Sequence, residues 1–422
     1  MRFGARLIGV ACVLLALGHA DAAETKNPLK LERVVQVMRH GIRPPTKATV
    51  TPPGIAREPW PTTWSVPYGH LTQHGADAIK LLGTYDKAQF VTRGLLATAC
   101  PKAGEVAIWS DTDERTIRTG DVMAQALFPN CKVLNGHLAE NANDPLFHPL
   151  EGPVKLDDAQ SKAAVQKAIG TIDALRAKHR ASFDVLQKIL GCCAPEVCAA
   201  AKLPANCRMA DLPADVSVEK SGERPDLTGP FDYGPSAAQT LALEYAEGLP
   251  MEQVGWGRAT QKDVAEALKL HSMKGDVLQR PDYLAVHGAG NLARRILDAL
   301  NGKGEGNGTK LTLLVGHDTN IGDLSGLFDF TWQVDTYPAD TTPPGSGPGF
   351  ELLSDASGNT FVRAIYRSQT MEQMRNLTPL DAAHPAFHQV LALPGCSTPQ
   401  DKTICTLADF NKLVESKLAA AK

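Results

Sequence analysis

Residues 31–47 read LERVVQVMRHGIRPPTK, and the fold is decided in this stretch. Its first half, residues 31–38, is a short apolar run with several valines, which predicts a buried β-strand. Gly41 then favours a turn, and the pair Pro44 and Pro45 prevents a helix from following directly. We therefore expect the residues between strand and prolines on a loop at the carboxyl end of a strand, where open α/β sheets bind ligands.

This loop carries a histidine between two arginines, in the order Arg39, His40, Arg43. Arginine presents a planar fork of donors that matches phosphate oxygens. An imidazole held among such forks can attack phosphorus as a nucleophile. A surface turn with scattered basic residues is the alternative, because Arg-His-Gly alone is a weak signal. The longer order Arg-His-Gly-x-Arg-x-Pro, directly after an apolar strand, favours a phosphate site.

Two later strands are expected to end in polar residues in the same way. The apolar run 106–110 leads into DTDERTIR at 111–118, and the run 311–315 leads into Gly-His317-Asp318. Acidic side chains at these positions also cap helices, and that is the structural alternative. Because each segment follows the carboxyl end of a strand, we expect the three to meet at one edge of the sheet.

The composition is that of an ordinary globular protein. The chain has 422 residues, of which 43% are hydrophobic and 21% charged, enough for a large core and two domains. The formal net charge is −3, and no basic run suits nucleic acid. We therefore expect no nucleic-acid partner, and a small-molecule substrate bound in a local basic pocket.

Residues 1–22 have the pattern of a secretory signal peptide. Two arginines precede the apolar run 7–17, and a small-x-small pattern places cleavage near Ala22. The run is too short to span a bilayer, and no later stretch is long enough. Lipidation at Cys12 is disfavoured because this cysteine falls early in the apolar run. We expect a periplasmic or secreted protein with no membrane partner.

The cysteines agree with export. The chain has nine, and removal of the leader with Cys12 leaves eight, an even number that suits an oxidising compartment. A zinc site is the alternative, but the cysteines lack paired Cys-x-x-Cys spacing. Sequence alone leaves the pairing of the eight open.

The motifs together resemble the histidine acid phosphatases, the second branch of the histidine phosphatase superfamily. The resemblance covers nearly the whole mature chain, at motifs near residues 39, 111, 256, 317 and 340. It implies an α/β fold of the phosphoglycerate-mutase-like type. In this fold a central, mostly parallel sheet is flanked by helices, and a second, mainly α-helical domain is inserted into it.

Domain boundaries follow from the helical patterns in the middle of the chain. We expect the α/β catalytic domain to span residues 23–134 and 301–422, with a mainly helical insertion at 135–300 that forms one wall of the cleft.

The cysteine arrangement also resembles that of bacterial family members. It offers three local pairs, and it leaves the adjacent Cys192 and Cys193 unassigned: Cys100 with Cys131, Cys198 with Cys207, and Cys396 with Cys405.

The resemblance implies a role for each motif residue. His40 would attack phosphorus and become a phosphohistidine, and Asp318 would give its proton to the leaving alcohol. Three arginines and a histidine would surround the phosphoryl group: Arg39, Arg43, Arg115 and His317. The scheme needs no metal and no cofactor. Because Asp318 must be protonated when the substrate arrives, we expect an acidic optimum.

The resemblance also implies which residues select the substrate. Thr46, Lys47 and Arg280 match positions that bind further phosphates in relatives that degrade inositol hexakisphosphate, which favours a phytase. Gln239 stands where some relatives have Glu. The alternative is a broad acid phosphatase or a glucose-1-phosphatase. A catalytically silent phosphate-binding protein and a phosphomutase are less favoured, because His40 and Asp318 are intact and the protein is exported. We expect a monomer.

Overall fold

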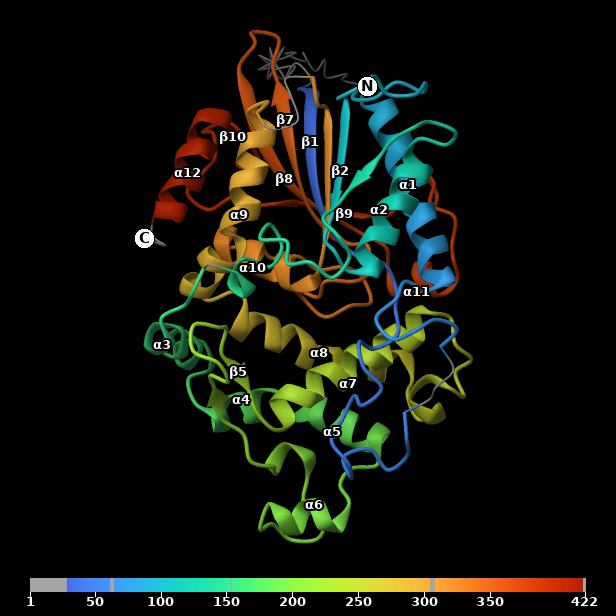
Figure 1. The fold of residues 1–422 in the computed structure, drawn as a ribbon, viewed down its shortest axis with the longest axis vertical. Helices are drawn as coiled ribbons and strands as arrows, with labels where there is room; N and C mark the ends of the chain where they lie inside the picture. The colour runs from blue at the N-terminus through green and yellow to red at the C-terminus, as the bar shows by residue number, and fades with distance from the viewer. Residues whose placement is uncertain (1–28, 61–63, 153, 304–307, 420–422) are drawn as a thin grey trace, which may run out of the picture.

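The structure is a computed structural model that describes residues 29–60, 64–152, 154–303 and 308–419. The expected signal peptide at residues 1–22 lies outside this range. A sheet with helices on both faces forms one part, and a group of helices lies beside its carboxyl edge (Figure 1). Within the described ranges, no helix is both long and apolar enough to cross a membrane.

The central sheet has eight strands, in the order β10-β8-β7-β1-β6-β2-β3, with β9 paired to β8. The strands are β1 (Lys30–Arg39), β2 (Val106–Ser110), β3 (Asn135–Gly136), β6 (Leu311–Gly316), β7 (Gly347–Ser354), β8 (Thr360–Ser368), β9 (Phe387–Leu391) and β10 (Cys405–Thr406). The pairs β1–β6, β6–β2 and β2–β3 are parallel, whereas β7, β8, β9 and β10 pair antiparallel.

The α/β fold is thus confirmed, but the expectation of a mostly parallel sheet is corrected: the sheet is mixed. The correction has a simple physical cause. β7 and β8 are joined by a short turn at residues 355–359, and such a turn can only produce an antiparallel pair. β7 then pairs antiparallel with β1, so one half of the sheet is parallel and the other antiparallel.

Strand β1 lies at the centre because both of its faces are apolar. Val34 and Met38 belong to one core cluster, which includes side chains of α1 (Gln73–Thr92) and α2 (Glu114–Leu127). Val35 and Val37 belong to the other cluster. This second cluster includes side chains of three further helices: α9 (Asp282–Leu300), α10 (Asp318–Phe328) and α12 (Leu407–Ala419). Alternate side chains of an extended strand point to opposite faces, which is why one apolar run can anchor both layers.

The remaining elements lie mainly in the middle of the chain. They are α3 (Asp158–Ile169), α4 (Ile172–Lys178), α5 (Arg180–Leu190), α6 (Pro195–Ala200), α7 (Pro230–Ala246), α8 (Gln261–Leu278) and α11 (Met371–Arg375), with β4 (Val216–Ser217), β5 (Asp226–Leu227) and 3₁₀ turns at η1 (Pro149–Glu151), η2 (Met209–Asp211) and η3 (Val254–Gly257). α9 falls inside the range 135–300 but contacts α10 and β1 of the sheet part. The domain boundaries therefore stay a prediction.

The eight cysteines in the described ranges form four disulfides. Three of them are the pairs that the sequence offered: Cys100–Cys131, Cys198–Cys207 and Cys396–Cys405. Cys192 and Cys193 pair with each other. A thiolate zinc site is excluded for these eight, because all of them are oxidised.

Candidate active site

The three polar segments meet at one edge of the sheet. β6 lies between β1 and β2, and the ends of β1 and β6 are in register, with Arg39 opposite Gly316. The next residues along the three strands are His40, Asp111 and His317. Parallel neighbours end at the same edge, so residues far apart in the sequence become neighbours in space.

His40 is buried, with 1% of its surface exposed. Its Nδ1 lies 2.8 Å from the carbonyl oxygen of Gly41. A carbonyl only accepts, so Nδ1 carries the proton and Nε2 keeps its lone pair. Burial and the nearby guanidinium groups of Arg115, Arg43 and Arg39 hold the pKa of His40 well below its usual value. A neutral imidazole with a free Nε2 is the form that can act as a nucleophile.

Gly41 allows the chain to turn away from the strand. A Cβ at this position would lie 2.7 Å from Leu71 and 2.9 Å from Ile79, inside the packed base of α1. The Gly41 N–H donates to the Thr119 hydroxyl of α2 at 3.0 Å. The absence of a side chain therefore lets the His40 loop lie against both helices.

Three arginines surround His40. Arg39 donates from Nη1 to the Thr342 carbonyl at 2.5 Å, and Arg43 donates from Nη2 to Gln239 at 3.3 Å. Arg115 donates from Nη2 to Asp113 at 2.6 Å.

These cations are only partly compensated. The Nε atoms of all three are buried without a hydrogen-bond partner. Burial, together with Arg39 and Arg115, lowers the pKa of Arg43 to about 9. Buried donors without acceptors are costly, and an anion bound among them would supply the acceptors.

His317 and Asp111 form a second pair beside this cluster. The His317 Nε2 lies 2.5 Å from Asp111 Oδ2, and its Nδ1 lies 3.5 Å from Nη2 of Arg115. The His40 and His317 rings lie 5.5 Å apart. Neither Asp111 nor Asp113 caps α2 with its side chain, so the capping alternative is wrong for this segment.

Asp318 is the first residue of α10 and faces the arginines. Its Oδ2 lies 3.0 Å from Nη2 of Arg39, 2.9 Å from Nε2 of Gln239 and 3.3 Å from Nε2 of His271. Burial alone would raise its pKa, but Arg39 and the hydrogen bond from His271 outweigh burial and hold the pKa well below the usual value. Without a substrate, Asp318 is therefore ionised.

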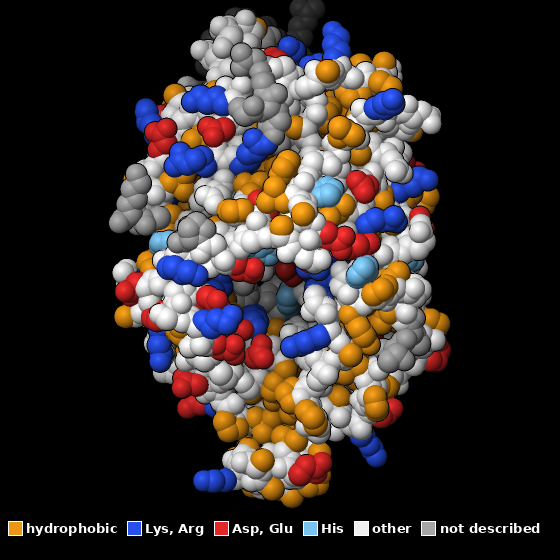
Figure 2. Space-filling view, in the orientation of Figure 1, with side chains coloured by type: hydrophobic (Ala, Val, Ile, Leu, Met, Phe, Trp, Pro, Cys, Tyr) orange, Lys and Arg blue, Asp and Glu red, His pale blue; other side chains and the backbone are white. Residues whose placement is uncertain are grey.

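A cavity of about 230 Å³ opens beside Asp318, between the sheet part and α7 and α8. The space-filling view shows a hollow at the centre of this face, with cationic and acidic side chains around it (Figure 2). Its lining includes Arg43, Gln239, His271, Lys274, Arg280 and Asp318. The site thus combines a cluster of cations with room for a substrate that extends toward the helical region.

The expected specificity residues are not all at this cavity. Arg280 lines it, but its guanidinium already donates to the Phe330 carbonyl at 2.7 Å and to Ser325 at 3.1 Å. Thr46 and Lys47 are exposed and are not among the residues that line it. Their role in substrate binding stays a prediction.

Sequence reasoning missed three residues: His148, His271 and Lys274. His148 Nε2 lies 2.7 Å from Asp111 Oδ2, and His271 contacts Asp318. Lys274 lines the cavity and pairs with Asp226 and Asp232, each at 2.9 Å. Each acts on residues that lie far from it in the sequence, so no local motif could have revealed it.

The chain is similar to known proteins along nearly its whole length. Residues 30–183 match the histidine phosphatase superfamily (branch 2). The phytase AppA of Escherichia coli (strain K12) is 34% identical, over 98% of this chain and 98% of its own length. A glucose-1-phosphatase of Providencia rettgeri is 28% identical over 99% of this chain and its full length.

Solved structures give the same result. The Hafnia alvei phytase in complex with tartrate superposes with a TM-score of 0.86 at 32% identity, covering 93% of this chain and 98% of its own. The same phytase in complex with myo-inositol hexakis sulphate gives a TM-score of 0.85 at 31% identity, with the same coverage of both chains. A phytase and a glucose-1-phosphatase are therefore both similar to this chain over nearly its whole length.

Proposed function

Because the chain belongs to branch 2 of the histidine phosphatase superfamily, as a phytase-like histidine acid phosphatase, we propose that it hydrolyses phosphate monoesters through a phosphohistidine at His40, with inositol hexakisphosphate as a substrate. One observation carries the proposal: a neutral, buried imidazole lies among three buried guanidinium groups, beside an aspartate.

The first step transfers the phosphoryl group to the protein. Nε2 of His40 attacks phosphorus in line, the P–N bond forms and the ester P–O bond breaks. Arg39, Arg43 and Arg115 neutralise the charge on the phosphoryl oxygens. Asp318 gives its proton to the departing oxygen, so that an alcohol leaves rather than an alkoxide.

The second step regenerates the enzyme. A water molecule attacks the phosphorus of phosphohistidine, and Asp318 takes its proton. The P–N bond breaks and inorganic phosphate leaves. A phosphate dianion near Arg39 would offset the pull of this arginine on Asp318, which is how an aspartate that is ionised in the free protein gains a proton in the complex.

The cavity supports a substrate with several phosphates. Lys274 and Arg280 line the same cavity as Arg43 and Asp318, and a highly phosphorylated ring would contact both groups at once. The E. coli phytase is the more similar of the two named relatives, and the Hafnia alvei phytase binds a hexakis sulphate of the same ring. The glucose-1-phosphatase of Providencia rettgeri supports the second candidate, a sugar phosphatase.

The disulfides are consistent with an exported protein. We place the enzyme in the periplasm, where it would act as a monomer on small phosphorylated molecules. Size-exclusion chromatography with light scattering tests the monomer, and fractionation of cells tests the location.

A rapid quench in alkali, in which a phosphohistidine stays intact, tests the chemistry. The protein is mixed with a ³²P-labelled ester and quenched within milliseconds, and the labelled residue is identified by peptide mapping. We expect acid-labile label on His40, none in His40→Ala, and undiminished label in the matched control His137→Ala, an exposed histidine outside the site. Label that persists in His40→Ala would overturn the proposal.

Substrate choice is measured separately. Turnover of inositol hexakisphosphate, glucose 1-phosphate and a chromogenic aryl phosphate is compared at one pH. A kcat/KM that is highest for the hexakisphosphate supports the phytase. A highest value for glucose 1-phosphate, with label still on His40, would retain the mechanism and replace the substrate.

A further inference from the structure

We propose that His148 is a positioning residue that controls the protonation of His317 through the carboxylate of Asp111. The inference rests on the proposed function, because it concerns how His317 donates to a phosphoryl oxygen. It concerns His148, which lies outside every sequence motif described above.

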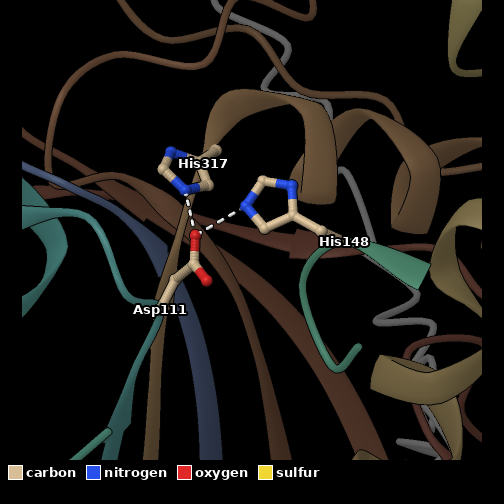
Figure 3. A group of neighbouring side chains, drawn as sticks. All are labelled: Asp111, His148 and His317. Carbon is tan, nitrogen blue, oxygen red and sulfur yellow. Dashed lines mark hydrogen bonds and ion pairs between the residues drawn. The ribbon is translucent and has the colours of Figure 1, made fainter. Parts of the chain in front are cut away.

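The three side chains come from separate parts of the chain. Asp111 follows β2, His317 follows β6, and His148 precedes the 3₁₀ turn η1. Both imidazoles use Nε2, and both lie against the same oxygen, Oδ2 of Asp111, at 2.7 Å for His148 and 2.5 Å for His317 (Figure 3). The two rings lie 5.3 Å apart. One carboxylate oxygen is therefore shared by two histidines.

The shared oxygen determines which ring nitrogens of the two histidines carry hydrogen. Burial would raise the pKa of Asp111, but hydrogen bonds from His148 and His317 outweigh burial and hold the pKa well below its usual range. An ionised carboxylate accepts only, so each Nε2 carries a hydrogen. A neutral His317 then has a lone pair on Nδ1, on the side that faces Arg115. To donate from Nδ1 to a phosphate oxygen, His317 must take up a second proton.

The two histidines compete for the same negative charge. Burial, Arg115 and the neighbouring His148 lower the pKa of His317, although Asp111 raises it. The pKa of His148 is raised: burial would lower it, but Asp111, Glu151 and Asp113 outweigh burial. The first proton that the two rings take up therefore goes to His148, and it opposes protonation of His317.

The surroundings of His148 allow this proton to exchange. Its side chain is 30% exposed, whereas that of His317 is 9% exposed. Three carboxylates face His148: Asp111, Asp113 and Glu151. Oε1 of Glu151 lies 3.4 Å from Nδ1 of His148. The titratable ring of His317 also faces His148. A phosphate dianion next to His317 makes His317, rather than His148, the preferred site of the proton. The dianion stabilises the imidazolium of His317, which donates a hydrogen bond to it.

A metal ion is the competing interpretation of this cluster. Ligand atoms of Asp111, His148 and His317 lie within 4.8 Å of one another. A metal bound by these atoms would have to displace the hydrogens that both Nε2 atoms donate to Asp111. Hydrogen bonds of 2.5 and 2.7 Å to one oxygen account for the arrangement without it.

Two variants separate charge from hydrogen bonding. His148→Asn keeps an N–H donor for Asp111 but removes the titratable charge, and His148→Leu removes both. In His148→Asn we expect the limb of kcat/KM that falls with rising pH to move upward by about half a unit to one unit, since His317 protonates more readily. In His148→Leu we expect kcat/KM to fall about tenfold, as loss of an orienting partner does in other sites.

The matched control is His137→Asn, the same substitution at an exposed histidine nearby. Its pH profile should equal that of the unchanged protein. Thermal melting of each variant shows that it is folded. A pH profile that does not move in either folded His148 variant would overturn the proposal, even if activity fell, because a merely structural contact lowers activity without moving the limb.

A binding measurement distinguishes failure of this inference from failure of the proposed function. The ¹⁵N signals of the histidine rings are titrated with pH, with and without inorganic phosphate, in the unchanged protein and in His148→Asn. We expect the pKa of His317 to rise in the variant, and to rise in both proteins with phosphate. An unchanged His317 titration refutes the role of His148, whether or not the enzyme turns over esters. A stoichiometric shift of both ring signals with Zn²⁺ would refute the hydrogen-bonded arrangement.

Discussion

The arginine cluster around His40, here called the sheet side, and the cavity wall of α7, α8 and Arg280, here called the helical side, differ in how their charges are balanced. On the sheet side, the Nε atoms of Arg39, Arg43 and Arg115 are buried without partners. On the helical side, Lys274 pairs with two aspartates, and Arg280 donates to Ser325 and a backbone carbonyl. Arg39 and Arg115 each pair with one aspartate, but their unpaired Nε donors can bind an anion without breaking an existing hydrogen bond.

The buried carboxyl groups differ in the same way. Asp318, on the sheet side, has a pKa well below its usual value, because Arg39 and His271 outweigh the effect of burial. Glu244 of α7, on the helical side, accepts one N–H from Gly255 and has no cation beside it, so burial raises its pKa to about 7. Beside the arginine cluster Asp318 is thus ionised, whereas Glu244 of the helical side stays protonated through the acidic range.

The largest expected effect is on the sheet side, in Asp318→Asn. Loss of the proton donor should lower kcat by about 10²- to 10⁴-fold for an alkyl phosphate. An aryl phosphate with a good leaving group should lose much less. Because Asp318 must be protonated in the complex, kcat of the unchanged enzyme should fall as pH rises above the acidic range, and the variant should keep only the part of this limb that His317 sets. Equal losses for both esters would contradict Asp318 as the acid.

Arg115→Lys tests whether the sheet side needs geometry as well as charge. Lysine keeps the positive charge but lacks the planar fork. We expect kcat/KM to fall about 10²-fold, the cost of losing one aligned donor at a developing negative charge. Arg118→Lys, one turn later on α2 and exposed, is the matched control and should retain full activity. Similar losses in both variants would show that the effect is on folding of α2.

Lys274→Met and Arg280→Met test the helical side. Both cations are already compensated, so we expect only a roughly two- to fivefold rise in KM for inositol hexakisphosphate. The kcat/KM for a small aryl phosphate, which does not reach this side, should stay unchanged. A loss of the size expected for Arg115 would contradict the comparison between the two sides.

Glu244→Gln tests the uncharged support on the helical side through stability. The folded pKa of about 7 lies above the unfolded value of about 4.3, so the native state holds the proton more tightly. The contribution of Glu244 is fully present at pH 4 and is lost as pH rises through 7, on the order of 2 to 3 kcal/mol. The melting temperature of the unchanged protein should therefore fall from pH 5 to pH 8 more than that of the variant. Equal decreases in the melting temperatures of the two proteins would contradict the raised pKa of Glu244.

The smallest expected effect is that of chelators, which should leave activity unchanged. The guanidinium groups of Arg39, Arg43 and Arg115 supply the positive charge that a metal would otherwise supply. Activity is measured after dialysis against EDTA, with Mg²⁺ and Zn²⁺ added back to separate samples. Loss of turnover in EDTA that a divalent ion restores would contradict the claim that the three arginines alone neutralise the phosphoryl group.

How much of the site could be predicted depended on distance along the chain. His40 with Arg39 and Arg43, and His317 with Asp318, stand in short motifs directly after strands, so local pattern was enough. The contacts of His148 with Asp111, and of His271 with Asp318, join segments separated by 37 residues in the first case. No local pattern carries such a pair, since a single histidine outside a motif has no distinguishing signal.

By itself, the sequence determined the buried strands, the turn chemistry after β1 and the residue types that reach the sheet edge. These follow from apolar periodicity and from backbone limits on Gly and Pro, which act over a few residues. Only the tertiary structure decided that the sheet is mixed, that Asp111 accepts from two histidines rather than capping α2, and that Lys274 is compensated. Those outcomes depend on which distant segments pack together, and the free energy of packing is a property of the whole chain.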